Sequence, residues 1–483
     1  MAMKKAKIYY FTLTDEMRKE EKLNWFRSHS IEQIEFENIK PDKNSNWINL
    51  ADTDFEKLLP LISDDTGHSL FSKYAMGVVT ARDEWVYDLN ESNLLEKMKF
   101  FIEHYNTLLK KNTEELDEVI KWSDTLRRNY INRKEIVFSK DKLVKALYKP
   151  YNHRFFYAEK ILNDRLTNNH IEIFGKNYNE NNKCFGLIGK DTVIPFSVLA
   201  FNVVNDLNSL SNAAGGNKTF PLCRVTSAGD RIDNITEWAL EQFRNHYHLS
   251  EPGFSVLKDE QDLTDGKKRE KLCKSVKNEN ADLDISKEDI FHYTYAVLHN
   301  PEYREKYELN LKREFPRIPF YDDFWKWAKW GKALMDLHIN YETAKPFDLK
   351  EHHSRTKAES RRRKEMYATL KEPEVMFGLQ PKLKPKLKAD REKGIIEIDE
   401  LTFLSSVPKE AWEYKLGNRS ALEWILDQYK EKKPKDPTIA EKFNTYRFAD
   451  YKEHVTDLLK RVCTVSIETM KIVDEMKKEN ISQ

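Results

Sequence analysis

The sequence contains few residues that break regular structure or cross-link a fold. Its 483 residues include only 14 glycines and 16 prolines, about half of their usual combined share of roughly 12%. Collagen-like and Pro/Gly-rich low-complexity proteins are therefore excluded. The four cysteines, Cys184, Cys223, Cys273 and Cys463, have neither CxxC spacing nor the density of a disulfide scaffold. We expect reduced thiols and no structural zinc.

Long apolar runs and an N-terminal targeting segment are also absent. Apolar stretches last only a few residues before a charge interrupts them, whereas a membrane-spanning helix needs ~20 apolar residues. Residues 1–5 (MAMKK) are followed directly by an alternating, strand-like segment, without the apolar core and cleavage site of a signal peptide. The sequence thus predicts a cytoplasmic protein without a membrane span.

Neither sign of charge dominates, because 81 basic and 80 acidic residues leave a net charge of +1. Any surface that binds nucleic acid must therefore be local. Aromatic residues are abundant, with 26 Phe, 22 Tyr and 10 Trp making up 12% of the chain. They supply anchors for folded cores, which excludes global disorder. At ~150 residues per domain, the length allows about three domains.

The first half of the chain mixes predicted strands and helices. Residues 7–13 alternate like a strand, and residues 15–28 have the pattern of a charged amphipathic helix. Residues 91–130 place apolar side chains at helical spacing and predict a long helical region that acts as a connector. Between residues 136 and 220, short apolar runs alternate with Asn/Gly-rich turns and predict a sheet-rich unit. The polar interval 257–283 predicts a flexible insertion.

The second half is mainly helical in prediction. Ser286 and Asp289 resemble a capping box before an apolar run, and Pro301 suits the first turn of a second helix. Residues 382–388 (KLKPKLK) look like a basic linker, and residues 394–404 like a strand pair. Further helices are predicted at residues 321–338, 420–432 and 450–476.

We therefore predict a multi-domain α+β protein with a helical connector, a sheet-rich recognition lobe and a helical C-terminal lobe. The predicted segments are an α+β segment at 1–90, the connector at 91–135, the sheet-rich lobe at 136–256, the insertion at 257–285 and the helical lobe at 286–483.

No signature of a self-sufficient enzyme is present. A Gly-rich dinucleotide fingerprint is missing, and Gly215-Gly216 lacks the Gly-Lys-Ser/Thr of a phosphate-binding loop. HExxH, GxSxG and the Asn/Asp-Pro-Pro-Tyr/Phe tetrapeptide of amino-methyltransferases are absent too. We predict no catalytic, metal-binding or cofactor-binding residues in this chain.

Histidines provide the nearest approach to a metal cluster. His246 and His248 are two residues apart, with His352 and His353 far along the chain and no evident third ligand. Histidines at this spacing face opposite sides of a strand and are poorly placed on a helix. Exposed or capping histidines are the simpler interpretation.

A basic tract is the strongest local electrostatic signal. Its members are Arg355, Lys357, Arg361, Arg362, Arg363 and Lys364, followed by Lys382, Lys384, Lys386 and Lys388. Phosphate neutralisation needs clustered Lys and Arg, because the interaction is local and screened by salt. The interleaved Glu359 and Glu365 leave a solvated helical face open as the alternative.

Four stretches spread along nearly the whole chain share the pattern of one protein family. Residues 71–87 read FSKYAMGVVTARDEWVY, and residues 147–165 read LYKPYNHRFFYAEKILNDR. Residues 289–320 and residues 414–429 (YKLGNRSALEWILDQY), the latter followed by 458–473, continue the series. In this order they resemble the single-chain type ISP restriction–modification enzymes and related adenine-specific DNA methyltransferases. Within the first stretch, Ala stands where that family usually has Ser.

The resemblance implies a role in DNA recognition. In that family the polypeptide order is nuclease, helicase, methyltransferase and C-terminal specificity region, and this chain resembles only the part beyond the methyltransferase motifs. Residues 7–13 then look like the last methyltransferase strand or the exit from it. The implied function is sequence-specific binding of double-stranded DNA, so that an adenine can be flipped into a neighbouring methyltransferase pocket. The methyltransferase/helicase–nuclease module, in the same or another chain, would bind S-adenosylmethionine.

The matched stretches also suggest DNA contacts. Arg82, Asp83 and Arg154 would lie close to the catalytic module, either as contacts near the flipped base or as ion pairs at the interface. An Arg82–Asp83 ion pair within the protein is the structural alternative. Asn418 and Arg419, in a turn before a helix, would present polar groups to phosphate or base, with a helix cap as the alternative. The predicted DNA-binding residues are Arg82, Arg154, Arg355, Lys357, Arg361, Arg362, Arg363, Lys384, Asn418 and Arg419. Base readers are expected in the unmatched loops 177–190, 209–218 and 345–391.

Two other functions remain open from the residues alone. One is a metal-dependent hydrolase or nuclease with dispersed carboxylates and His246 or His248. The other is a protein-binding scaffold that lacks DNA affinity and uses an aromatic surface between Tyr293 and Trp330. Trp325, Trp327 and Trp330 have the chemistry to stack nucleobases, but their amphipathic spacing favours core packing.

Overall fold

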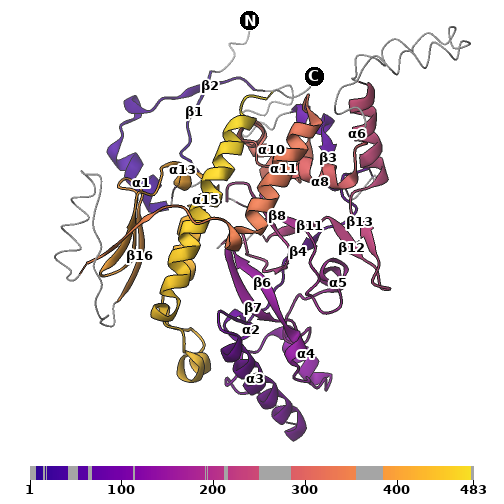
Figure 1. Cartoon of the computed structure of the whole chain (residues 1–483), viewed down its shortest axis with the longest axis vertical. Helices are drawn as coiled ribbons and strands as arrows, with labels where there is room; N and C mark the ends of the chain where they lie inside the picture. Colours follow the sequence, from indigo (N-terminus) through magenta and orange to yellow (C-terminus); the bar gives the residue numbers. More distant parts are fainter. Residues whose placement is uncertain are drawn as a thin grey trace, which may run out of the picture.

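In the computed structural model, helices and several small sheets are mixed along the chain, which confirms the α+β fold class (Figure 1). The structure describes residues 7–14, 17, 19–41, 53–63, 68–112, 115–190, 192, 194–211, 216–249, 284–354 and 384–479. The predicted insertion at 257–283 lies outside the described residues.

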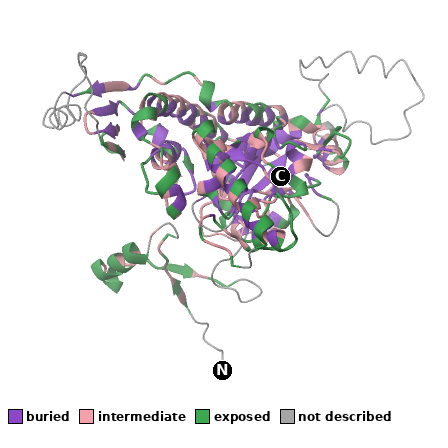
Figure 2. Cartoon of the chain, turned by 90° about the horizontal axis from the view of Figure 1, so that it is seen from below, coloured by how far each residue is buried: buried purple, intermediate pink, exposed green. Residues whose placement is uncertain are grey.

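The N-terminal residues form a small lobe apart from the main body (Figure 2). Strand β1 (Ile8–Tyr10) pairs antiparallel with β2 (Glu37–Ile39), and helix α1 (Lys19–Ser28) lies between them in the sequence. The strand and the helix predicted at 7–13 and 15–28 are thus confirmed. Phe11 stacks on Trp25 with ring centroids 5.1 Å apart, but no residue of α1 is buried. This lobe belongs to neither hydrophobic core.

Two four-stranded sheets form the centre of the molecule and confirm the predicted sheet-rich unit. The first sheet has the order β10-β6-β7-β5, with β5 at Tyr87–Asp88, β6 at Leu143–Lys149, β7 at Asn152–Tyr157 and β10 at Val204–Asn205. The second has the order β4-β11-β8-β9, with β4 at Ala75–Met76, β8 at Cys184–Ile188, β9 at Ser197–Phe201 and β11 at Lys218–Pro221. Helix α5 (Asn168–Phe174) and the hairpin of β12 (Cys223–Val225) and β13 (Arg231–Asp233) lie beside them.

Among the described residues, the predicted helical connector contains two helices. Helix α3 (Glu91–Lys111) follows the short α2 (Asp83–Val86) and ends at Asn112, whose backbone is left-handed with φ +55°. A new helix, α4 (Asp124–Ile131), then begins where the Ser123 hydroxyl accepts a hydrogen bond from the Leu126 amide at 3.3 Å. The left-handed Asn112 donates its amide to the last carbonyls of α3 and stops that helix before α4 begins.

The remaining α-helices of the described structure all lie from Glu237 onward in the sequence. They are α6 (Glu237–Leu249), α8 (Lys287–Val297), α9 (Pro301–Lys306), α10 (Glu308–Arg313), α11 (Phe324–Ile339), α13 (Glu410–Glu413), α14 (Ala421–Gln428) and α15 (Lys452–Met476). The Ser286 capping box precedes α8, and Pro301 occupies the first turn of α9, as predicted. Small strand pairs join β14 (Arg317–Ile318) to β3 (Leu59–Pro60), and β19 (Lys415–Leu416) to β20 (Arg419–Ser420).

The C-terminal sheet corrects the predicted linker. Its order is β15-β18-β17-β16, with β15 at Lys350–His353, β16 at Pro385–Asp390, β17 at Ile395–Asp399 and β18 at Thr402–Ser405. The hairpin predicted at 394–404 is confirmed, but residues 385–388 belong to an edge strand. Pro385 is tolerated there because a proline at the first residue of an edge strand costs no ladder hydrogen bond.

Two hydrophobic cores combine segments that are far apart in the sequence. The first joins α3, β6 and β7 to α14 and most of α15, and the second joins β8, β9 and β11 to α8 and α11. Helix α15 contributes to both, with Val462 in the first core and Met476 in the second. The division of the chain into five segments stays a prediction.

The aromatic residues of α11 lie in the second core. Trp327 and Trp330 are buried, Trp325 is half-buried, and Tyr293 of α8 is also buried. This confirms core packing for these tryptophans and leaves little aromatic surface for a scaffold function. Within the described residues, no helix combines the length and apolar character needed to cross a membrane.

Helices α8 and α11 approach each other closely at Gly331, where an added Cβ would lie 1.7 Å from the His292 carbonyl oxygen. We expect Gly331→Ala to lower the free energy of unfolding by ~1–3 kcal/mol, because overpacking forces the helices apart. Urea denaturation measures this difference. The control is Lys329→Ala, at an exposed position of the same helix. Equal denaturation midpoints for the two variants would contradict the expectation.

Candidate functional site

Three of the family-like stretches meet at one polar face of the first core. The hydroxyl of Tyr148, at the end of β6, donates to Asp83 at 3.2 Å. The guanidinium of Arg154, on β7, donates to the side-chain oxygen of Gln428 at the end of α14, at 3.4 Å. Glu84 accepts from the backbone amides after α14, at 2.9–3.0 Å. Residues distant in the sequence thus form one surface.

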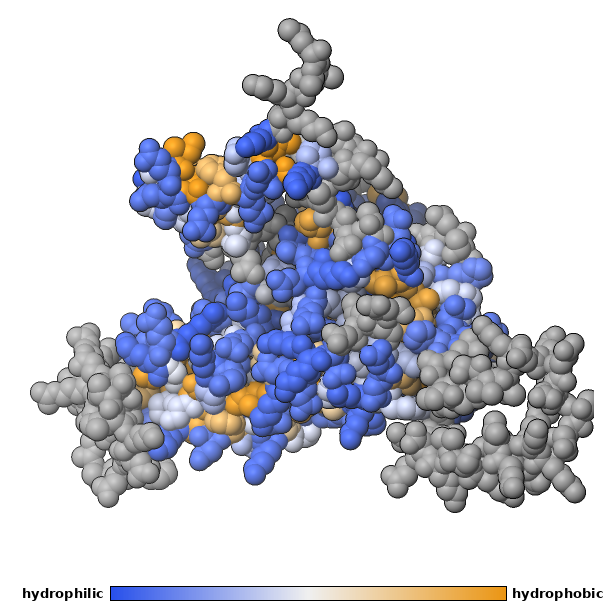
Figure 3. Space-filling view, turned by 90° about the horizontal axis from the view of Figure 1, so that it is seen from above, coloured by the Kyte–Doolittle hydropathy of each residue, from blue (hydrophilic) through white to orange (hydrophobic). Residues whose placement is uncertain are grey.

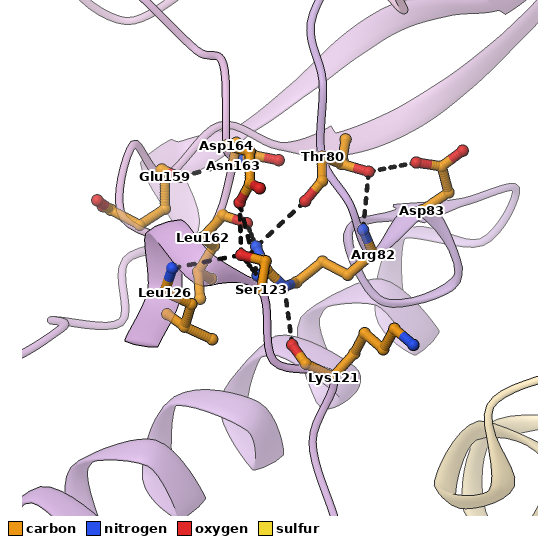
Figure 4. A network of polar contacts seen from close by, with 10 residues as sticks. All are labelled: Thr80, Arg82, Asp83, Lys121, Ser123, Leu126, Glu159, Leu162, Asn163 and Asp164. Atoms are coloured by element: carbon orange, nitrogen blue, oxygen red, sulfur yellow. Dashed lines mark hydrogen bonds and ion pairs between the residues drawn. The ribbon is translucent and has the colours of Figure 1, made fainter. Parts of the chain in front are cut away.

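Arg82 is buried inside the protein, where its guanidinium joins several loops through hydrogen bonds (Figure 4). We call this arrangement the Arg82 clamp. Its side chain is 0% exposed, and an ion pair with Asp164 spans 3.8 Å. Its guanidinium donates to the carbonyl oxygens of Lys121, Thr80 and Leu162 and to the hydroxyl of Ser123. Burial lowers the pKa of Arg82 to about 10, and Asp164 opposes this shift. Each of the three guanidinium nitrogens donates within the protein, so the structure does not place Arg82 on a surface that DNA can reach.

The suggested Arg82–Asp83 ion pair is not formed in this arrangement. Asp83 instead accepts hydrogen bonds from the Thr80 hydroxyl and from Tyr148. In the segment formed by residues 80–83, Arg82 therefore points inward and Asp83 points toward the polar face. The two neighbouring residues hold different parts of the structure.

A buried carboxyl lies beside this face. Asp206 follows β10, is 4% exposed, and accepts a hydrogen bond from the Asn208 amide at 2.8 Å. Burial, followed by the charge of Asp83, raises the pKa of Asp206 to about 7. The ammonium of Lys149 donates to the carbonyl oxygens of Asn208 and Ser211 at 2.5 and 2.8 Å. Sequence reasoning missed Asp206, whose only signal is a charge at the end of an apolar run.

Arg154 is the half-buried cation of the polar face. Its guanidinium carbon lies 4.0 Å from the centre of the Tyr148 ring, a stacking geometry that arginine favours. Its Nε donates to the side-chain oxygen of Asn152 at 3.2 Å. An arginine held between the amides Asn152 and Gln428 has the chemistry of base or phosphate recognition.

A cavity of about 720 Å³ borders the same face beside Tyr148. Its acidic lining residues are Asp83, Glu84, Asp117, Glu118 and Asp436, and its basic ones are Arg82, Lys121, Arg127 and Lys435. Because Arg82 is already paired inside the protein, the carboxylates outweigh the remaining cations. This cavity is therefore poorly suited to a DNA phosphate.

Asn418 and Arg419 lie in the tight β19–β20 hairpin, as the sequence predicted. The turn consists of Gly417, with φ +66°, and the exposed Asn418. Arg419 lies 3.3 Å from Asp427 and over the ring of Trp424. The helix cap is formed by Ser420, whose hydroxyl accepts from the Glu423 amide. Asn418 thus takes no part in the cap and faces solvent.

The basic tract is only partly described. Arg355, Lys357, Arg361, Arg362 and Arg363 lie outside the described residues. Lys384 is exposed next to β16, and Figure 1 shows β16 well apart from β6 and β7. The structure therefore does not bring Lys384 together with Arg154. His352 is buried, with its Nε2 2.7 Å from the Ser405 hydroxyl, so it adds nothing to a cationic surface.

The histidines proposed for a metal site do not meet a third ligand in the described structure. His246, on α6, stacks on Phe320 with ring centroids 3.9 Å apart, while the side chain of His248 is not described. Across the described ranges, no group of three or more His, Cys, Asp or Glu side chains is placed to hold a metal ion. Nothing in this arrangement favours the hydrolase alternative.

Comparison with known proteins identifies the family. The type ISP C-terminal specificity domain matches residues 69–458, and the chain belongs to this family. The resemblance seen in the sequence is thereby confirmed. A comparison with curated proteins found no match.

Solved structures show the same fold. Over 98% of its length the chain is similar to the protein of a DrdV–DNA complex determined by cryo-electron microscopy, with 37% identity and a TM-score of 0.74. It also shares the fold of a nuclease-deletion mutant of the type ISP enzyme LlaGI in complex with a DNA substrate mimic, with 24% identity over 99% of the chain and a TM-score of 0.68. A third structure is the ATP-dependent type ISP enzyme LlaBIII bound to DNA, with 23% identity over 93% of the chain and a TM-score of 0.66. The chain spans 43%, 40% and 26% of these proteins, respectively.

Replacing the Arg82 clamp should destabilise the fold. We expect Arg82→Ala to lower the free energy of unfolding by ~3–5 kcal/mol, because it leaves buried carbonyl oxygens unpaired and removes a buried cation from its partner. Lys121→Ala is the matched control, since the exposed Lys121 side chain is lost while its carbonyl oxygen remains. Urea denaturation of both variants measures the effect, and a small loss for Arg82→Ala would refute the clamp.

Asp206 should make stability depend on pH. Its folded-state pKa lies above the ordinary value of about 3.9, so the folded state holds the proton more tightly than the unfolded state. This stabilising contribution is complete below about pH 4 and disappears as the pH rises to about 7. Asp206→Asn cannot ionise and keeps the acceptor for Asn208. We expect its free energy of unfolding to decline less than that of the wild type between about pH 5 and about pH 8.

The buried histidines act in the opposite direction. Burial lowers the pKa of His170 and of His292 to about 4, so their contribution is lost as the pH falls. Both proteins share this effect, so the difference between wild type and Asp206→Asn isolates the carboxyl. Asp230→Asn, at an exposed position, should follow the wild type. Parallel pH curves for wild type and Asp206→Asn would rule out the assigned role.

Proposed function

We propose that this chain is the specificity part of a restriction–modification DNA (adenine-N6) methyltransferase and binds double-stranded DNA in a sequence-specific manner. The observation that carries the proposal is the meeting of the family-like stretches around the stacked Arg154. Family membership supports it, as does the similarity to proteins whose structures were solved with DNA.

Arg154 and Arg82 have different parts in this proposal. Arg154 is partly accessible and held flat on Tyr148, so its remaining donors can face a phosphate or a base edge. Arg82 positions the loop that carries Asp83, which in turn holds Tyr148. Arg82 thus supports the site from within and is a positioning residue rather than a DNA contact.

The other predicted DNA contacts remain part of the proposal. Asn418 and Arg419 are presented by a rigid hairpin, and Lys384 is exposed beside the C-terminal sheet. Together with Arg355, Lys357, Arg361, Arg362 and Arg363, these residues supply positive charge and amide groups for binding the DNA backbone. Phosphate contacts fix the register of a protein on the duplex, and base contacts then select the sequence.

The chemistry would lie in another module, in the same or another chain. That methyltransferase/helicase–nuclease module would bind S-adenosylmethionine, and the complex would act in the cytoplasm, where the free thiols Cys184, Cys223 and Cys463 stay reduced. The N-terminal lobe offers a contact surface for it. Its hydrophobic residues are exposed in Figure 3, with Ile31 73% and Tyr9 60% accessible.

DNA binding by the chain should depend steeply on salt. With ~6–10 phosphate contacts, affinity for a duplex falls about 10³–10⁵-fold between about 50 and about 200 mM salt. Fluorescence anisotropy with labelled duplexes over a salt series measures this slope. Absence of binding to any duplex at low salt would overturn the proposed function.

Arg154→Ala tests the polar face directly. Loss of a charge-assisted hydrogen bond should weaken binding of the preferred duplex roughly 10- to 150-fold at constant salt. Arg133→Ala removes an equal charge from an exposed position outside the site and serves as the control. The same anisotropy titration measures both, with thermal melts to show that each variant is folded. An equal, small effect for the two variants would exclude Arg154 from the interface.

A further inference from the structure

A groove of about 730 Å³ lies between helix α5, with the loop that follows it, and the β12–β13 hairpin. Figure 1 shows this hairpin beside α5 at the edge of the molecule. The residues that line the groove come from two stretches, 168–180 and 224–232. Part of the first stretch belongs to the unmatched loop 177–190, where base-reading residues were expected.

The two rims of the groove are held at a fixed distance by one side chain. The amide nitrogen of Asn182 donates to the carbonyl oxygen of Ile173, on α5, at 2.9 Å and to that of Cys223, on β12, at 2.7 Å. All three residues of β13 are exposed. The hairpin is thus anchored at its base and open along its length, which prepares the groove for a partner without rearrangement.

Arg224 stands out within the groove because its guanidinium is left with an unused donor. It is half-buried, and its Nε is inaccessible to solvent yet has no hydrogen-bond partner among the described residues. Arg224 is opposite Ile232 in the hairpin register, so both side chains point to the same face. A buried donor without a partner is costly. The buried Nε cannot itself reach a ligand, but the two terminal nitrogens of Arg224 also form no hydrogen bond or ion pair among the described residues, so they are left for a ligand in the groove that Arg224 lines.

The charges around the groove leave it positive. Glu172 is paired with Lys73 at 2.9 Å, and Glu180 is paired with Arg231 at 3.6 Å. Both carboxylates in the lining are therefore neutralised by cations beside it. Arg224 and the exposed Lys176 are the remaining charged lining residues. The groove therefore fits a partner that offers hydrogen-bond acceptors.

The uncharged part of the lining has the chemistry of base edges rather than of phosphates. It includes the amides Asn168, Asn177 and Asn179 and the hydroxyls Thr226 and Ser227. A phosphate track needs clustered Lys and Arg, and here two cations stand beside three amides and two hydroxyls. Base edges in the major groove of DNA present donors and acceptors that such side chains read, and that groove admits a two-stranded β-ribbon.

We propose that the groove between α5 and the β12–β13 hairpin reads base edges in the DNA major groove, with Arg224 donating to a guanine. The two acceptors on a guanine edge match the two-pronged guanidinium, which makes arginine its usual partner. This inference rests on the proposed DNA-binding function and adds to it a specificity-determining residue.

The experiment selects preferred sequences from a library of randomised duplexes, using the full chain as wild type, Arg224→Ala, Arg224→Lys and Arg128→Ala. We expect the wild type to enrich a motif that contains guanine, and Arg224→Ala to lose the preference at that one position, by roughly 5- to 150-fold. Arg224→Lys keeps the charge but lacks the two-pronged geometry, so it should lose the same preference. Arg128→Ala removes a charge from an exposed position on α4 and should enrich the wild-type motif.

The outcomes separate this inference from the function on which it rests. A wild-type chain that binds no duplex, or enriches no motif, overturns both. If Arg224→Ala and Arg224→Lys both select the complete wild-type motif, the proposed role of the groove is wrong and the proposed DNA-binding function stands. Uniform weakening on every sequence with an unchanged motif also overturns the role of the groove, because that is the behaviour of a phosphate contact. Thermal melts show whether each variant is folded. If Arg224→Ala does not fold, the motif selected by Arg224→Lys tests the role of Arg224.

Discussion

The buried guanidinium of Arg82 is the interaction on which the polar face depends. It joins the loop before α2 to the start of α4 and to the segment after β7, which are far apart in the sequence. A charged group so deeply buried is tolerated only because each of its three nitrogens donates to an oxygen atom. With that loop fixed, Asp83 holds Tyr148, and Tyr148 in turn provides the ring on which Arg154 lies. One buried charge therefore determines where an accessible charge stands.

The two cores explain how distant segments form one body. Helix α15 contributes side chains to both cores. It packs in the first core together with α3, and in the second together with α11. The N-terminal lobe is different, since its aromatic residues contact one another and remain largely accessible. A lobe with little buried apolar area gains little stability on its own. Its accessible apolar side chains are the surface that we propose for contact with the catalytic module.

Local sequence signals predicted local structure well and contacts between segments poorly. The Ser286 capping box and the 394–404 hairpin were readable because cap and turn chemistry acts over a few residues. The break at Asn112 was missed because helical spacing carries no information on a left-handed residue. Arg82 and Arg224 look alike in the sequence, yet the first meets carbonyl oxygens from remote loops, while the Nε of the second meets no acceptor among the described residues. Only the fold distinguishes them. The function was predicted from the family-like stretches and not from these local signals.

The Asn182 bridge has a consequence for how new target sequences can arise. It ties α5 to β12 through backbone carbonyl oxygens, which every residue possesses, so the spacing of the rims is independent of the side chains that line the groove. Substitutions of lining residues can then alter which base pairs are favoured while the scaffold keeps its shape. The spacing of the two rims is therefore independent of the DNA sequence that is preferred, and single substitutions in the lining can change that preference one residue at a time.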